Sequence, residues 1–236
     1  MKKMAFALLG LVLVAPAHSQ ELNPSPYEWR ELPIEAVDTV EVHGTFRVSL
    51  VTGKDTAKVA FQGPAEMMAD ALATVEDGTL TIAFKDDKAW SSNPGSRMSA
   101  VVYLPHVRSV KTKGPAQIDI PWNKTESFSA GIDGAGRINV ERLEAKRVSA
   151  AIGGSGSIRI EGQADEARYA IGGAGSIEGK RLRVSEAKIA IGGAGSVYAD
   201  VSDTADIAVG GAGRVEVVGG ATCNISPVES PKVECR

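Results

Sequence analysis

Apolar and polar residues alternate with a period of two over much of the chain, and short glycine-rich segments interrupt this alternation at regular intervals. Phe128, Ala130 and Ile132 lead into one such segment, and a second alternating run begins after it at Ile138. A period of two is typical of β-strands that bury one face. Each unit therefore predicts a strand, a glycine turn, a second strand and a polar turn.

The glycine-rich segment recurs along the chain with an almost constant spacing. Its middle glycine occupies five positions, which are Gly134, Gly154, Gly173, Gly193 and Gly211. The steps between them are 20, 19, 20 and 18 residues, and a degenerate earlier copy covers 113–118. Such a regular period indicates a solenoid, in which each unit buries its apolar side against its neighbours. The sequence therefore predicts an all-β fold, a parallel β-helix with coils of about 18–20 residues, whose paired glycines would form a corner with a positive φ.

The N-terminal half is less regular, although it also alternates. Strands are expected within 39–51, 58–61, 79–84 and 99–104, one short helix over 64–74, and a polar loop over 85–97. We therefore expect a single β-helix domain over 37–218, with irregular coils over 37–107 and regular glycine-rich coils over 108–218. A small separate β-sandwich in the N-terminal half is the alternative. Residues 20–36 would form a linker, and residues 219–236 a C-terminal cap or tail.

The first residues have the pattern of an export signal. Lys2 and Lys3 precede a short apolar run over 5–14, and small residues suited to cleavage follow it. This pattern predicts a secretory signal peptide over 1–19, and no later run is long and apolar enough to span a membrane. The mature chain is therefore expected in the periplasm or outside the cell.

Charge and cysteine content narrow the possible partners and predict a disulfide. The formal net charge is −3, and without Lys2 and Lys3 it becomes 24 − 29 = −5. A mildly acidic chain without a basic stripe argues against nucleic acid as a partner. Cys223 and Cys235 are the only two cysteines, and in an oxidising compartment we expect them to form a disulfide.

Two further segments and the repeats carry a resemblance to a known family. The segments are Val40-Glu41-Val42-His43-Gly44-Thr45-Phe46-Arg47-Val48 and Gly78-Thr79-Leu80-Thr81-Ile82. With the glycine-rich repeats, the region from about Val37 to Val217 resembles the putative auto-transporter adhesin head GIN domain family. The resemblance implies a bacterial envelope protein, a right-handed β-helix and a role in adhesion, and it brings no catalytic motif.

The glycine-rich repeats and the outward carboxylates beside them offer candidates for calcium binding and for catalysis. The calcium-binding β-roll places Asp two residues after the last glycine, whereas this chain has Ile or Val there, as at Ile158. Polysaccharide cleavage needs paired carboxylates. Glu178 and Glu216 would share one outward column two coils apart, at about 10 Å, near the upper limit for an inverting pair.

A column of small residues is the main candidate for binding. Ala151, Ala170, Ala190 and Ala208 would point outward in register beside the glycine turns, with Gly131 in line. They predict either a flat docking face or a tight corner that admits only small side chains. Trp90 and Trp122, in or near expected loops, could instead bind a sugar or a protein or cap the end of the helix.

These observations favour a non-enzymatic envelope protein without metal or cofactor, which binds a glycan or an envelope partner or has a structural role. A polysaccharide-degrading β-helix enzyme and a self-assembling rod are the alternatives. The sequence leaves the ligand and the oligomeric state open.

Overall fold

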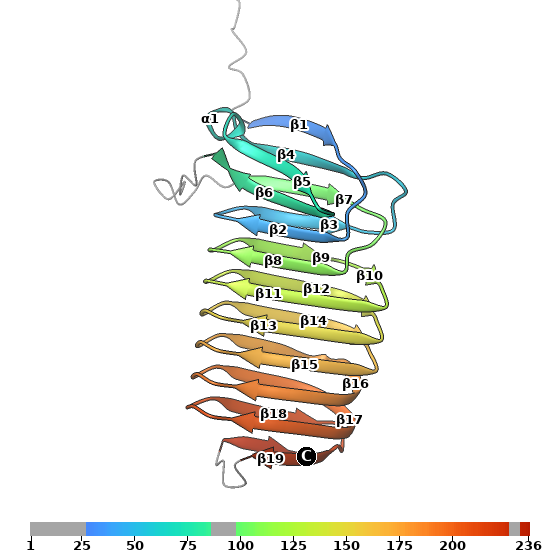
Figure 1. Cartoon of the computed structure of the whole chain (residues 1–236), viewed down its shortest axis with the longest axis vertical. Coiled ribbons are helices and arrows are strands. Elements are labelled where there is room, and N and C mark those ends of the chain that lie inside the picture. Colours follow the sequence, from blue (N-terminus) through green and yellow to red (C-terminus); the bar gives the residue numbers. More distant parts are fainter. Residues whose placement is uncertain (1–26, 86–97, 227–231) are drawn as a thin grey trace, which may run out of the picture.

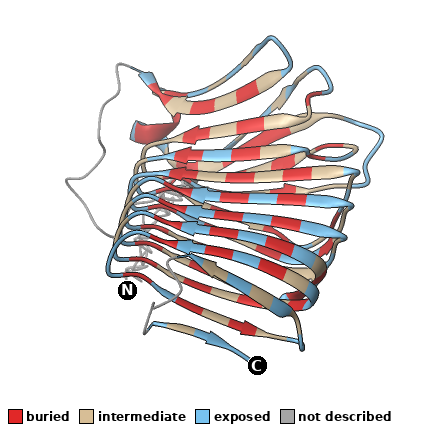
Figure 2. Cartoon of the chain, turned by 60° about the horizontal axis from the view of Figure 1, so that its bottom comes forward, coloured by how far each residue is buried: buried red, intermediate tan, exposed pale blue. Residues whose placement is uncertain are grey.

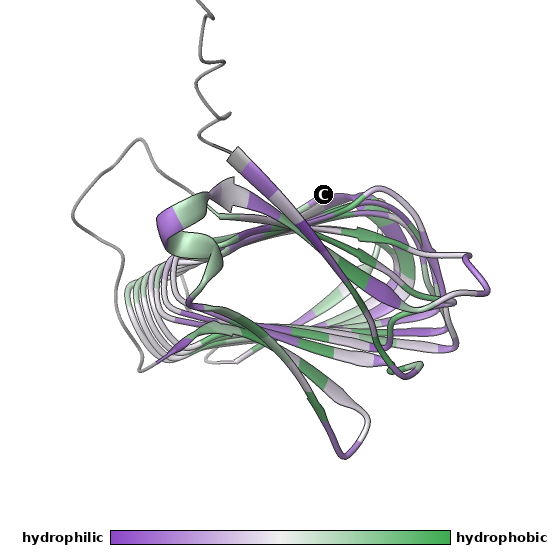
Figure 3. Ribbon diagram, turned by 90° about the horizontal axis from the view of Figure 1, so that it is seen from above, coloured by the Kyte–Doolittle hydropathy of each residue, from purple (hydrophilic) through white to green (hydrophobic). Residues whose placement is uncertain are grey.

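The computed structural model describes residues 27–85, 98–226 and 232–236, in which the chain forms a tall stack of β-coils (Figure 1). The described strands all belong to one continuous sheet that winds around a hydrophobic interior. Seen along the stack, the coils superimpose as a wall around this interior (Figure 3). The predicted parallel β-helix is therefore confirmed.

Two long faces make up the regular part of the stack. Face A consists of β8 (Ser109–Lys113), β11 (Ser127–Asp133), β13 (Arg147–Ile152), β15 (Glu166–Ile171), the later parts of β16 (Ser176–Ile191) and β17 (Ser196–Val209), and β19 (Thr222–Ser226). Face B consists of β9 (Gln117–Ile120), β12 (Arg137–Glu144), β14 (Ser157–Gln163), the earlier parts of β16 and β17, β18 (Arg214–Val218) and β20 (Val233–Cys235). The short β10 (Asn123–Lys124) pairs with the end of β12 on a narrow third side.

Parallel pairing places equivalent residues directly above one another. On face A, Ile132, Ile152, Ile171 and Ile191 stack in successive coils and end at Val209. All five are buried, and the alternation of buried and exposed residues is visible along each strand (Figure 2). Stacking at one position thus converts the sequence repeat into a continuous apolar core, because each coil buries its neighbours' side chains.

The N-terminal half extends the same stack but does not follow chain order. Strands β2 (Thr39–His43) and β3 (Arg47–Val51) form a coil that lies between two others, one made by β6 (Thr79–Phe84) and β7 (Ser99–Tyr103), the other by β8 and β9. Beyond β6 and β7, the stack ends in antiparallel strands β1 (Tyr27–Pro33), β4 (Lys58–Pro64) and β5 (Ala71–Glu76), together with helix α1 (Ala65–Met68). The end cap is therefore formed by segments that precede the regular coils in the sequence.

The ends of the chain differ from the expectations. The short helix expected over 64–74 ends at Met68, because Ala71 turns its side chain into the core and its strand pairs with β6. Residues 27–33 of the expected linker form strand β1. Residues 222–226 and 233–235 of the expected tail add one further partial coil.

The glycine pairs have a different physical cause from the one expected. Glycines with positive φ include Gly114 and Gly134, but those of the later pairs, such as Gly172 and Gly173, do not adopt that conformation. A Cβ on Gly173 would instead collide with the carbonyl oxygen of Gly154 in the previous coil. A Cβ on Gly172 would come no closer than 3.9 Å to the carbonyl oxygen of Ile152. The second glycine of each later pair is therefore required by close approach between coils, whereas the first glycine has room for a Cβ at Gly172, Gly192 and Gly210.

The expected disulfide joins Cys223 and Cys235 across the C-terminal end of the stack. Cys223 pairs in register with Ala205 on face A, and Cys235 with Val217 on face B. Because Ala205 and Val217 are buried core residues, the disulfide lies beneath the last layer of the core and connects the two faces.

Gly173→Ala and Gly172→Ala form a matched pair that tests the corner. We expect Gly173→Ala to lower the free energy of unfolding by at least about 2 kcal/mol, because the added methyl group overpacks the coil contact. Gly172→Ala should lie within about 1 kcal/mol of the wild type and tend to stabilise it through the unfolded chain. Urea denaturation of both variants measures the difference, and equal effects would contradict the explanation.

Removal of the disulfide should destabilise the chain. We expect Cys223→Ala combined with Cys235→Ala to lower the free energy of unfolding by about 3 kcal/mol, as the chain-entropy model predicts for a short loop. Reduction of the wild-type protein should have a similar effect, and the double variant should no longer respond to reductant. Equal stability of the oxidised and reduced wild-type protein would argue against this role.

Candidate functional site

A flat strip of small residues runs along the outer surface of face A. The cross-strand register aligns five residues in successive coils, which we call the alanine column: Gly131, Ala151, Ala170, Ala190 and Ala208. Its four alanines are exposed, on strands whose neighbouring positions are buried. The expected outward column is therefore present, and its side chains leave the surface of the sheet level.

Packing within the chain does not explain why this column is small. Towards the N-terminal end, the same register position holds Glu41 and Lys111, which precede Gly131 in the stack. The backbone at this position therefore admits long side chains. In the neighbouring column, Gly172 and Gly192 also have room for a Cβ. The tight-corner interpretation thus applies to the second glycine of each pair and not to the alanine column.

Polar side chains border the alanine column two residues earlier on each strand. In successive coils this border contains Ser149, Arg168, Lys188, Asp206 and Asn224. The border lines a shallow depression on the outer surface together with three of the alanines, which are Ala170, Ala190 and Ala208. The depression combines a flat apolar floor with charged groups on one side, which is an arrangement suited to binding an extended ligand.

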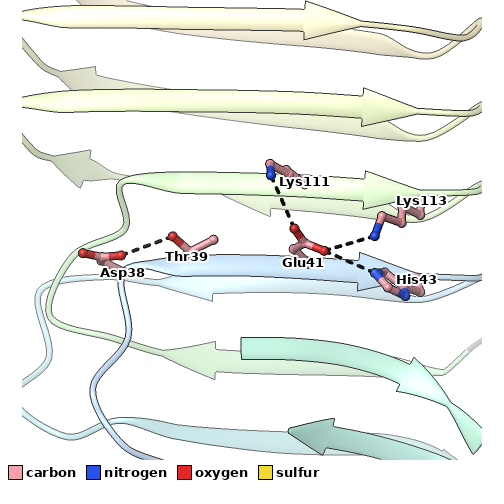
Figure 4. A network of polar contacts seen from close by, with 6 residues as sticks. All are labelled: Asp38, Thr39, Glu41, His43, Lys111 and Lys113. Atoms are coloured by element: carbon pink, nitrogen blue, oxygen red, sulfur yellow. Dashed lines mark hydrogen bonds and ion pairs between the residues drawn. The ribbon is translucent and has the colours of Figure 1, made fainter. Parts of the chain in front are cut away.

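A charged cluster occupies face A on the N-terminal side of the column (Figure 4). Glu41 lies 3.4 Å from each of Lys111, Lys113 and His43. Burial alone would raise the pKa of Glu41, but the hydrogen bond from His43 and the charges of Lys113 and Lys111 outweigh it and hold the pKa below its ordinary value. The cluster therefore joins the irregular coil to the first regular one through charge pairing.

The two candidate catalytic carboxylates, Glu178 and Glu216, lie on face B in the expected column, with Tyr198 between them. Lys180 lies 3.1 Å from Glu216 and 5.0 Å from the ring centre of Tyr198, and Arg236 also contacts Glu216. The hydrogen bond from Lys180 is the main cause that lowers the pKa of Glu216. A general acid needs a raised pKa, so Glu216 is unsuited to that role.

The tryptophans lie away from the alanine column or outside the described residues. The ring of Trp122 packs against Gly53, and its carbonyl oxygen accepts a hydrogen bond from Thr52. Trp122 thus covers a loop beside the first coil, whereas Trp90 lies outside the described residues. Trp29 lies on β1 at the N-terminal end of face B, and its side chain is 65% exposed. The alternation pattern did not predict a strand in this segment.

The fold and surface define a β-solenoid protein whose candidate site is an extended outer face. The chain belongs to the family described as "Putative auto-transporter adhesin, head GIN domain", whose model matches residues 36–221. The expected family is therefore confirmed, and it indicates a binding or adhesion role and an envelope or extracellular location. No described helix has the length and apolar character needed to cross a membrane.

Solved structures from Bacteroides and Parabacteroides share the fold. A "putative adhesin" from Bacteroides fragilis is 21% identical with a TM-score of 0.75, and the match covers 84% of this chain and 90% of that one. A "putative lipid binding protein" from Parabacteroides distasonis is 17% identical with a TM-score of 0.69, covering 86% and 93%. A "putative adhesin" from Parabacteroides merdae is 18% identical with a TM-score of 0.67, covering 90% and 94%. No curated protein matches the chain.

Glu41→Gln should destabilise the chain at neutral pH and not at low pH. A carboxylate whose folded pKa lies below its unfolded value near 4.5 stabilises the fold above pH 4.5, and this contribution disappears as the pH falls through the folded pKa. We expect a loss of up to about 1 kcal/mol at pH 7. Denaturation of wild type and variant between pH 3 and pH 7 measures it, with Glu186→Gln as a control for charge. A difference that did not decrease between pH 7 and pH 3 would contradict the prediction.

Proposed function

We propose that this chain is an exported, non-enzymatic protein of the bacterial envelope that binds a glycan or an envelope partner through face A. The alanine column carries the proposal. Its residues are small, although the same register position holds Glu41 and Lys111 in the coils towards the N-terminal end. A flat surface kept free of side-chain bulk without an internal packing reason is expected where a partner lies against it. The signal-peptide pattern over 1–19 and the adhesin family support export and binding.

The two alternatives receive less support. A glycan-cleaving enzyme would need a carboxyl group that can donate a proton, whereas Lys180 and Arg236 form ion pairs with Glu216 and favour its ionised form. A self-assembling rod would need free ends, whereas antiparallel strands β1 and β5 close the N-terminal end and the disulfide ties the C-terminal coil. Binding along the side of the stack uses the surface that the fold leaves exposed.

The first test is a binding screen of purified mature protein against envelope glycans, with the supernatant analysed for released sugar. Binding without cleavage supports the proposal. Cleavage would replace it with the enzyme alternative, and the absence of both would direct attention to an envelope protein as the partner.

Variants then locate the binding face. We expect Ala170→Gln combined with Ala190→Gln to weaken binding at least about tenfold, because two protruding side chains prevent flat contact. Ser157→Gln combined with Ser176→Gln makes a matched change in two successive coils of face B and should leave affinity unchanged. Equal affinity of both double variants, with unchanged melting temperatures, would exclude the alanine column as the binding surface.

A further inference from the structure

The C-terminal end of the stack leaves its last layer of inward-facing residues partly uncovered. In the preceding coil the inward positions are buried, and they are held by Ala205, Ile207, Val215 and Val217. In the last partial coil the same positions are half-buried or exposed, and they are held by Cys223, Ile225, Val233 and Cys235. Within the described parts of the chain, no strand lies beyond β19 and β20 to cover this layer.

The free edges of these two strands can accept a further strand. β19 pairs with β17 and β20 pairs with β18, so the far side of each strand has no partner strand among the described residues. Edge strands of soluble proteins often carry charged residues or proline, which discourage pairing with another chain. The edge strand β1 at the other end of the stack contains Glu28, Glu31 and Pro33. β19, with the sequence Thr-Cys-Asn-Ile-Ser, contains neither kind of residue.

The order of residues in β19 makes a second copy of this strand a complementary partner. An antiparallel pair centred on Asn224 would set Cys223 opposite the partner's Ile225, so that inward apolar residues meet each other. It would also set Thr222 opposite the partner's Ser226 on the outer surface, and no charged residue of β19 would face another. The two strands would be related by a two-fold axis through Asn224, which is the usual symmetry of a homodimer.

The disulfide shows that the same axis also suits face B. Cys223 and Cys235 are bonded across the interior, and successive strands run in opposite directions on the two faces (Figure 1). One residue along each strand, Asn224 therefore lies across from Glu234, and one residue further Ile225 lies across from Val233. Rotation about the axis would place the disulfide of each copy over the aliphatic pair of the other. The two Glu234 side chains would meet, and the Arg236 side chain 3.4 Å from each offsets part of their repulsion.

We propose that two copies of this chain associate through β19 and β20, end to end, as a two-fold symmetric dimer. The partly uncovered layer of each chain would become the centre of a continuous apolar core, and its burial would drive the association. The capped N-terminal ends would point away from the interface, so that assembly stops at two copies and does not continue as a rod. This interface lies at the end of the stack, and it does not depend on which ligand face A binds.

Sedimentation equilibrium of the purified mature protein tests the dimer. We expect the mass to rise from one chain to two between about 1 and about 200 μM, because an interface of two strand edges is at the small end of protein interfaces. Asn224→Lys should weaken association at least about tenfold, since two lysines would meet at the axis. Within the chain the new lysine lies beside Asp206. Asn139→Lys is the matched control, because Asn139 also points outward beside an aspartate, Asp119, and it should associate like the wild type.

X-ray scattering of the wild type distinguishes this dimer from association through the long faces, because end-to-end contact should nearly double the maximum dimension. A mass that stays at one chain, a dimer no longer than the single chain, equal association of Asn224→Lys and wild type, or an equal loss in Asn139→Lys would each overturn the inference. Both variants should melt like the wild type at the lowest concentration, where all three are single chains, so that weaker association cannot result from unfolding.

Discussion

The close approach of successive backbones at the glycine corner is the constraint on which the rest of the structure depends. A Cβ on Gly154, Gly173, Gly193 or Gly211 would collide with a carbonyl oxygen of the coil before it. Without a Cβ there, each coil settles in parallel register on its neighbour, and every other position stacks on its equivalent. The apolar ladders of the core and the columns of the surface both follow from this register.

Register also explains how such a chain can evolve a binding face. An outward position is repeated in every coil, so its residues form a column rather than a single site. Where neighbouring coils place opposite charges together, as Lys124 and Glu144 do at 3.0 Å, the column stabilises the stack. Like charges also meet in the stack, as Arg168 with Lys188 and Glu166 with Glu186 do, so a surface column can carry residues that the stability of the stack does not require.

The repeat made the regular coils predictable, because a spacing of 18 to 20 residues and a period of two determine which residues stack and which side they take. The cap could not be predicted in this way. In β1 the inward position opposite Phe61 is held by Arg30, whose guanidinium lies 5.2 Å from the ring centre of Phe61. A charged residue in a core-facing position hides the alternation that marks a strand.

Tertiary contacts also determine which side chains fit at single core positions, and a sequence pattern cannot predict these. The ring of Tyr169 occupies a core position that holds alanine in the coil before it. It fits because Gly179 leaves space where a Cβ would lie 2.8 Å from the tyrosine oxygen. Burial raises the pKa of Tyr169 far above its ordinary value, so the side chain stays neutral. The glycine that permits this lies on the opposite face, and no local signal connects the two positions.

The two ends of the stack differ from the regular coils, and this difference limits where a partner can bind. At the N-terminal end, β1 and β5 run antiparallel to the strands that they cover, so their free edges do not continue the parallel register of the coils. At the C-terminal end, β19 and β20 are parallel and short, and the disulfide joins them. The cap therefore ends the series of equivalent coils at one end, and the disulfide ties the last partial coil to its neighbours at the other. The long outer faces are the only part of the described structure in which one surface position is repeated coil after coil, so an extended partner that uses this repeat has to bind along the side of the stack.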